Sequence, residues 1–145
     1  KDKTVIITKG VDAKTIKVGP TVALKGDTYK VIGIGNSAFA GLRKATKVVI
    51  NGNVTSIGDK AFAKSKKIKN VTIGADVTKI GKQAFMNCTK LSKVILKGTG
   101  LTNKSFGKKA FSKTAKKVAV KWGKVKGKQR TQLKKALKKA GMKVK

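Results

Sequence analysis

The chain has 145 residues, which is enough for one domain with a modest hydrophobic core. It contains 35 lysines and 2 arginines against 5 aspartates, with no glutamate and no histidine, so its formal charge is +32. No apolar run of about 18 residues is present to cross a membrane, and the single cysteine excludes an intrachain disulfide.

The N-terminal part of the chain carries strand signals but no repeat. Residues 3–8 and 15–18 are rich in β-branched side chains, which predicts two strands. Residues 21–24 and 28–32 predict a hairpin around an intervening Gly-Asp turn. We expect residues 1–33 to form an N-terminal β cap that covers the first repeat.

A phrase of eight residues then recurs along the chain. It reads IGNSAFAG from Ile34, IGDKAFAK from Ile57 and IGKQAFMN from Ile80, and a looser copy, FGKKAFSK, begins at Phe106. The third unit gains three residues within 97–106, where glycines suit a loop. A fixed period of this length predicts a solenoid, in which each turn packs on its neighbours. The units run over residues 34–56, 57–79, 80–105 and 106–122.

One column of the repeat holds phenylalanine and two others hold aliphatic side chains. The phenylalanines are spaced by 23, 23 and 26 residues, and we expect their rings to stack inside the solenoid. They are Phe39, Phe62, Phe85 and Phe111. The aliphatic columns belong to V-x-I segments, which predict short parallel strands with inward residues two apart. They are Val48, Ile50, Val71, Ile73, Val94, Leu96, Val118 and Val120. Each Ala-Phe segment predicts one helical or 3₁₀ turn opposite the strands.

Residues 123–145 form the basic C-terminal end. Within 127–141, Leu133 and Leu137 share one helical face with two alanines while lysines take the other, which predicts an amphipathic helix. This helix either covers the last repeat or lies on an anionic membrane surface. Its apolar face is small for lipid, so we expect a capping helix and tail, with Trp122 sealing the last repeat rather than stacking on a sugar.

The pattern I-G-x-x-A-F followed by V-x-I, at a period of 23 residues, resembles the BspA-like leucine-rich repeat. The resemblance covers Ile34 to Val120, although cysteine fills the family's small-residue position only at Cys88 and Ala45 replaces its usual leucine. It implies a repeat solenoid of β-rich α/β class, with a parallel sheet of short strands and helical or 3₁₀ turns on the opposite side. The expected superhelix is right-handed and capped at both ends. Proteins with this repeat are typically exported bacterial surface proteins, many of them implicated in adhesion.

The composition argues against an enzyme. Without histidine or glutamate, the acid–base groups are the five aspartates, Tyr29, Cys88 and the lysines, and no two carboxylates share a predicted site. No cluster of histidine, cysteine or carboxylate suits a metal ion, so we expect neither metal nor cofactor. Cys88 lies at a small inward position with no imidazole partner, which favours a buried structural thiol.

The lysines admit three interpretations: a solvated coat, a contact surface for anionic glycans, or a nucleic-acid surface. The excess of lysine over arginine and the inward phenylalanines disfavour nucleic acid. Strand alternation places Lys47, Lys93 and Lys117 in one outward column of the sheet, and this column is the candidate ligand-binding face. The same column includes Asn70, and the next holds Val49, Thr72, Ile95 and Ala119.

We therefore predict a non-catalytic, monomeric binding or adhesion protein that is secreted or lies on a bacterial cell surface. Its expected partner is an anionic polysaccharide, such as a wall polymer, or a protein of a host matrix or cell surface. One alternative is a structural spacer within a larger exported protein. A basic protein associated with nucleic acid is the third.

Overall fold

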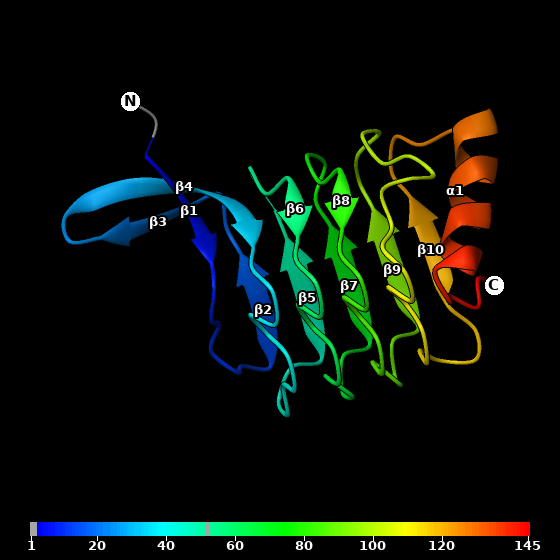
Figure 1. Ribbon diagram of the computed structural model, residues 1–145, viewed down its shortest axis with the longest axis horizontal. Helices are drawn as coiled ribbons and strands as arrows, with labels where there is room; N and C mark the ends of the chain where they lie inside the picture. The colour runs from blue at the N-terminus through cyan, green and yellow to red at the C-terminus, as the bar shows by residue number, and fades with distance from the viewer. Residues whose placement is uncertain (1–2, 52) are drawn as a thin grey trace.

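The computed structural model describes residues 3–51 and 53–145 and shows a solenoid of stacked turns (Figure 1). Two largely parallel sheets run along the solenoid, and one helix lies at its C-terminal end. The predicted repeat solenoid with a parallel sheet of short strands is confirmed. Residues 1 and 2, which belong to the predicted N-terminal cap, lie outside the described residues.

The V-x-I segments form the first sheet. Its strands are β2 (Thr15–Val18), β5 (Lys47–Ile50), β7 (Asn70–Ile73), β9 (Lys93–Leu96) and β10 (Ala119–Trp122). Val48, Val71 and Val94 lie side by side in register and are fully buried, because alternate residues of a strand point to one face. The sheet begins one strand earlier than the repeat pattern, since β2 pairs with β5 and places Ile16 opposite Val48.

The register of the fourth unit differs from the prediction by two residues. Val120 lies opposite Val94, and Trp122 lies opposite Leu96. The alignment of Val118 with Val94 is therefore wrong, although Val118 is buried and forms a bridge with Val144. The first inward valine lies nine positions after the phenylalanine in every unit, from Phe39 and Val48 to Phe111 and Val120. Stacked turns of equal path length require this constant spacing.

A second sheet, which the sequence analysis did not predict, lies across the core from the first. Its parallel strands are β1 (Thr4–Ile7), β4 (Asp27–Ile34), β6 (Ser56–Ile57) and β8 (Lys79–Ile80). The predicted hairpin is confirmed, because β3 (Thr21–Leu24) pairs antiparallel with β4. β6 and β8 contain only two residues each, which is too short for an alternating pattern to show in the sequence.

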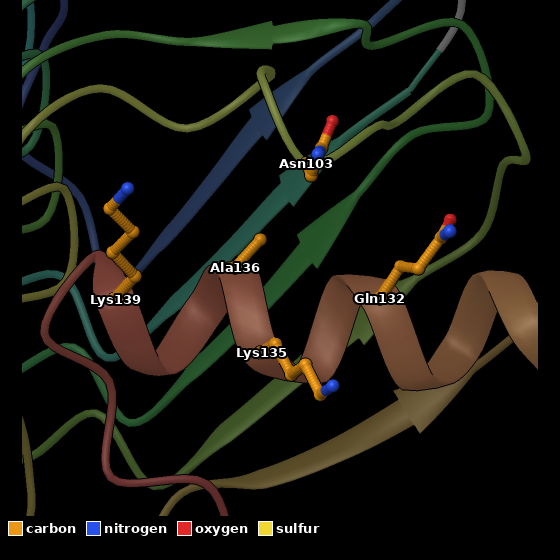
Figure 2. Close-up of a pocket in the computed structure, with 5 residues that line it drawn as sticks. All are labelled: Asn103, Gln132, Lys135, Ala136 and Lys139. Carbon is orange, nitrogen blue, oxygen red and sulfur yellow. The ribbon is translucent and has the colours of Figure 1, made fainter.

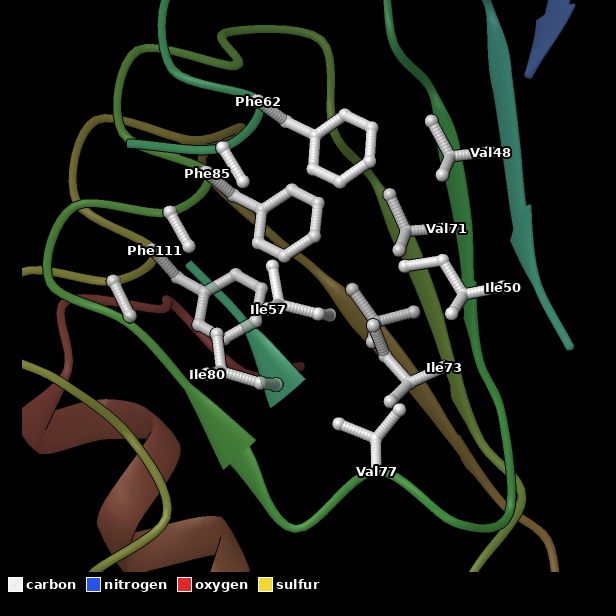
Figure 3. Close-up of a cluster of buried hydrophobic side chains, with 14 of the residues drawn as sticks. Val48, Ile50, Ile57, Phe62, Val71, Ile73, Val77, Ile80, Phe85 and Phe111 are labelled. Atoms are coloured by element: carbon white, nitrogen blue, oxygen red, sulfur yellow. The ribbon is translucent and has the colours of Figure 1, made fainter. Parts of the chain in front are cut away.

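The phenylalanine rings stack in one column between the two sheets (Figure 3). Neighbouring centroids are 5.1, 5.1 and 5.2 Å apart, and the ring planes agree within 4°. The column ends at Gly10, which occupies the position that a phenylalanine has in the later units. The Gly10 N–H donates to the Ala38 carbonyl, just as the Phe39 N–H donates to the Ala61 carbonyl in the next unit. A Cβ atom at Gly10 would lie 1.7 Å from the Phe39 ring, so only glycine leaves room for the terminal ring.

The Ala-Phe segments are single turns that bond alternately to themselves and to the next unit. The Ala38 N–H donates back to the Gly35 carbonyl, as in a 3₁₀ turn, whereas the Phe39 N–H donates across to Ala61. This alternation prevents the turns from extending into a helix. It also brings the backbone into the left-handed region (φ between 56° and 63°) at seven residues that are not glycine. These are Ser37, Lys60, Lys64, Gln83, Asn87, Lys109 and Lys113.

Helix α1 (Gly127–Lys139) lies against the last turn (Figure 1). Leu133 and Leu137 are fully buried on its inner face. The Phe111 N–H donates to the carbonyl of Ala140, the residue that follows the helix. In the earlier units the phenylalanine N–H donates to an alanine carbonyl of the next unit, so Ala140 replaces that acceptor. The solenoid ladder is thus satisfied at this end by the helical segment.

Candidate functional site

The predicted lysine column lies on the outer face of the first sheet, but only part of it is assembled. Lys47, Asn70 and Lys93 lie side by side on β5, β7 and β9. Lys117 is outside the column, because Ala119 lies opposite Lys93. The structure therefore brings together two of the three predicted lysines and separates them by an asparagine. The constant spacing of nine residues between ring and strand was the sequence signal that would have placed Lys117 correctly.

The next outward column is a row of small, mostly shielded side chains. Val49, Thr72 and Ile95 lie side by side, and lysines stand at the two ends, Lys17 on β2 and Lys121 on β10. Thr72 is only 8% exposed, although it points away from the core. On this face, lysines therefore flank a row of two apolar side chains and a threonine.

A second lysine-rich region, missed by the sequence analysis, is concave. Two adjoining cavities of about 260 and about 460 Å³ lie between α1 and the loop of residues 97–106, and both are lined by Asn103, Ala136 and Lys139. Figure 2 shows Gln132, Ala136 and Lys139 along the side of α1 that faces Asn103. We call this region the α1 groove. It is lined by Asn103, Phe106, Gly107, Lys108, Gln132, Lys135, Ala136, Lys139 and Ala140.

The loop wall of the α1 groove is held by hydrogen bonds. The Gln129 side-chain amide donates to the carbonyl oxygens of Thr99 and Leu101, at 2.6 and 3.2 Å. Within the loop, the Thr102 N–H donates to the Ser105 Oγ at 2.8 Å. The loop of residues 97–106 thus forms an ordered wall that carries Asn103 and Lys104.

Charge is unevenly distributed along the solenoid. Residues 77–145 contain 22 of the 37 basic residues and none of the 5 aspartates. Among the described residues there is one ion pair, between Lys3 and Asp27, and it lies at the N-terminal end. Residues 77–145, which include the α1 groove, therefore have a positive potential with no acidic side chain of their own to offset it.

Two of the aspartates hold the backbone of neighbouring turns. Asp12 accepts hydrogen bonds from the backbone N–H groups of Arg43, Lys44 and Ala45. Partial desolvation opposes ionisation there, but these donors and the Lys44 charge outweigh it and lower the pKa of Asp12. Asp59 accepts from the Lys82 N–H at 2.8 Å. These carboxylates act as turn caps, and their positions do not form an acid–base pair.

Cys88 is a buried structural thiol. Its side chain is fully buried, and the sulfur donates to the Phe62 carbonyl at 3.2 Å. Burial raises the pKa of the Cys88 thiol to about 12, against a smaller opposing effect of a hydrogen bond with Ser65. The thiol therefore carries its proton at neutral pH, which makes it a poor nucleophile. In the described part of the chain, no three His, Cys, Asp or Glu side chains gather where a metal ion would bind.

Trp122 is half-buried on β10, and the Arg130 guanidinium lies 5.8 Å from the centroid of its ring. This contact joins α1 to the last strand and occupies one face of the indole, which leaves less of Trp122 open to a sugar. Within residues 3–51 and 53–145, no helix is both long and apolar enough to cross a membrane.

A family model of the BspA type leucine-rich repeat region matches residues 27–126 in six copies. The chain belongs to this BspA type leucine-rich repeat family. The family resemblance inferred from the sequence is therefore confirmed, and the match begins before Ile34, in agreement with the pairing of β4 in the second sheet. This family and its fold are generally non-catalytic.

Solved leucine-rich repeat proteins share the fold. A protein from Bacteroides capillosus has a TM-score of 0.70 and 22% identity, over 82% of this chain and 86% of that protein. One from Bacteroides ovatus has a TM-score of 0.65 and 28% identity, over 81% of this chain but only 32% of that protein. A leucine-rich cell surface protein from Faecalibacterium prausnitzii has a TM-score of 0.53 and 23% identity, over 81% of this chain and 41% of that protein. No curated protein matches the chain by sequence.

Proposed function

We propose that this chain is a non-catalytic binding module on the outside of a bacterial cell, and that it holds anionic polymers through its lysine-rich surface. The observation that carries the proposal is the near absence of internal charge compensation. The chain has 37 basic residues, and the described residues contain a single ion pair. Such a surface attracts a polyanion over distances of about 8 Å at physiological salt.

The repeat core supports a binding role because it presents these lysines on a rigid frame. The stacked phenylalanines and the two sheets bury the apolar side chains of every unit. The Cys88 thiol is buried and protonated, and Asp12 and Asp59 cap turns, so these three groups serve the fold. Membership of the BspA type family and the likeness to a cell surface protein support the location outside the cell.

The proposal is tested on an array of glycans and matrix proteins at a salt concentration of about 0.15 M. We expect signals on sulfated or carboxylated glycans to exceed those on neutral glycans. Polyglutamate is the matched control, because it supplies the same sign of charge without sugar. Equal binding to polyglutamate and to acidic glycans would reject glycan binding and leave only general attraction between opposite charges.

The spacer remains the second candidate, since the N-terminal end leaves apolar side chains uncovered. Ile6, Val11 and Leu24 are 53%, 83% and 46% exposed near the free edges of the first turn. A further repeat stacked there would cover them. Failure to bind any acidic polymer at physiological salt would favour the spacer.

A further inference from the structure

The α1 groove differs from the rest of the lysine-rich surface because it combines charge, hydrogen-bonding groups and an apolar floor in a concave site. Lys108, Lys135 and Lys139 supply positive charge, and Asn103 and Gln132 supply amide groups. Phe106, Ala136 and Ala140 lie among them. No aspartate lines either cavity.

We propose that the α1 groove binds one chain of an acidic polysaccharide, with the lysines on its sulfate or carboxylate groups and the amides on its hydroxyls. This inference rests on the proposed function and assigns it a location and a ligand class. Acidic sugars carry all three features that the groove matches: anionic groups, hydroxyls, and the apolar C–H faces of the rings.

The size and order of the groove suit a preformed ligand site. Its larger cavity, at about 460 Å³, lies within the range of pockets that hold small ligands, about 300–1,000 Å³. Gln129 ties the loop to α1, and the Thr102–Ser105 bond stabilises the loop itself. Walls that are ordered before binding lose less conformational entropy when the ligand arrives.

The α1 groove adjoins a further cavity beside the earlier units. A neighbouring cavity of about 330 Å³ shares Gly107 with it and is lined by Lys79, Lys82 and Lys104. A linear polymer that leaves the α1 groove therefore continues past further lysines along the solenoid. Asp59, at the far side of that cavity, is the one carboxylate in its lining.

Nucleic acid fits this site less well. Bases bind single-stranded sites by stacking on open aromatic rings, whereas Phe106 is half-buried against Phe111, at 6.2 Å between centroids. Arg130 lies over one face of Trp122, and Tyr29 lies on β4 at the other end of the solenoid. Lipid is also disfavoured, because the exposed large apolar residues lie near the N-terminus rather than on α1.

The test uses two variants with the same loss of charge and one with none. The groove variant is Lys108→Gln, Lys135→Gln, Lys139→Gln. The matched control is Lys17→Gln, Lys47→Gln, Lys121→Gln, which removes three exposed lysines from the outer face of the first sheet. The neutral variant is Asn103→Ala, Gln132→Ala.

Affinities for a short heparin fragment, an oligogalacturonate and a single-stranded DNA of equal charge are measured by calorimetry at about 0.15 M salt. Heparin represents a sulfated source and oligogalacturonate a carboxylated one. We expect the groove variant to lose at least tenfold in affinity for whichever saccharide the wild type binds more tightly. The logarithm of the loss in the charge-matched control should be less than half that of the groove variant. The neutral variant should lose about tenfold, because two hydrogen bonds are removed.

Equal losses in the groove variant and its control would overturn the α1 groove while leaving the proposed function in place. No loss in the neutral variant would overturn it too, since the affinity would then come from charge alone. DNA binding as tight as saccharide binding, with the same loss in the groove variant, would make the site a nucleic-acid site. If the wild-type protein binds neither saccharide, the α1 groove proposal fails, and the proposed function fails with it only if no acidic polymer on the array binds either. Thermal melting of each variant shows that a loss is not caused by unfolding.

Discussion

The phenylalanine column predicts a difference between replacing a ring in its middle and replacing the ring at its end. Phe85 stacks on two rings, Phe62 and Phe111, whereas Phe39 stacks on one ring and on the backbone of Gly10. A stacked pair contributes about 0.5–1.5 kcal/mol beyond the area that it buries. Replacement by leucine keeps an apolar side chain and adds a packing cost of about 1 kcal/mol at either site.

Phe85→Leu should therefore lower the free energy of unfolding by about 2–4 kcal/mol, and Phe39→Leu by about 1.5–2.5 kcal/mol. The difference between the two variants corresponds to one stacked pair. It is the quantity of interest, because the packing cost is common to both.

Urea unfolding followed by circular dichroism and by the fluorescence of Trp122 measures this difference. Coincident transitions from the two probes would show that the solenoid unfolds as one cooperative unit, so that the free energies are comparable. Phe62→Leu serves as a replicate of the central position, since Phe62 also stacks on two rings. Equal losses at Phe39 and Phe85, or a larger loss at Phe39, would refute the claim that ring stacking stabilises the repeat.

Three further predictions concern backbone strain and titration. Lys64→Gly and Lys113→Gly should each raise the free energy of unfolding in urea by about 1 kcal/mol. Both lysines have φ near +60°, at the position that Gly41 occupies in the first unit. No gain at either site would contradict this prediction. Cys88→Ser should remove a loss of stability at high pH. The folded pKa of Cys88 is raised from 9.0 to about 12, so between these pH values the wild type loses about 1.4 kcal/mol of stability per pH unit relative to the serine variant. Parallel pH profiles of the two proteins would contradict this prediction. Asp12→Asn should destabilise the protein at pH 7 and converge with the wild type in acid. The stabilisation by the ionised carboxylate is complete above the unfolded pKa of 3.8 and is lost as the pH falls through the lowered pKa of the folded state. A difference that persists in acid would mean that charge is not the cause.

The second sheet was invisible in the sequence for a physical reason. β6 and β8 are two residues long, and their only regular feature is one inward isoleucine per turn. Alternation needs several residues to be recognised. The strands exist because neighbouring turns hold them in register, as the pairing of Ile57 with Ile80 shows.

The N-terminal segment was assigned as a cap because it lacks the Ala-Phe phrase. Its division from the repeats at residue 33 stays a prediction. The structure shows that β2 extends the first sheet and that Gly10 takes the position of a phenylalanine. Because glycine replaces phenylalanine there, the repeat cannot be recognised in the sequence of this segment. The backbone nevertheless follows the same path as in the later units.

The basic face shows where a pattern of residue types is insufficient. The sequence predicted Lys117 beside Lys93 because the V-x-V of residues 118–120 matches the inward pattern. In the structure, the register of β9 and β10 places Ala119 opposite Lys93, so Lys117 lies outside the column. The α1 groove brings Asn103 and Lys108 together with residues of α1 that lie about 30 positions later, and that distance in the chain has no periodic signal.

The repeat by itself determined the architecture of this protein, because a period of 23 residues with one ring and two inward aliphatic residues per turn buries its apolar side chains only when successive turns stack. The sequence also determined the family, through the repeat motif, and the large positive charge, through its composition. Only the tertiary structure decided which lysines lie together. Side chains that face solvent need not be apolar, so the sequence pattern does not show which of them are neighbours. Their neighbours depend on strand register, on the loop inserted in the third unit and on the position where the helix docks.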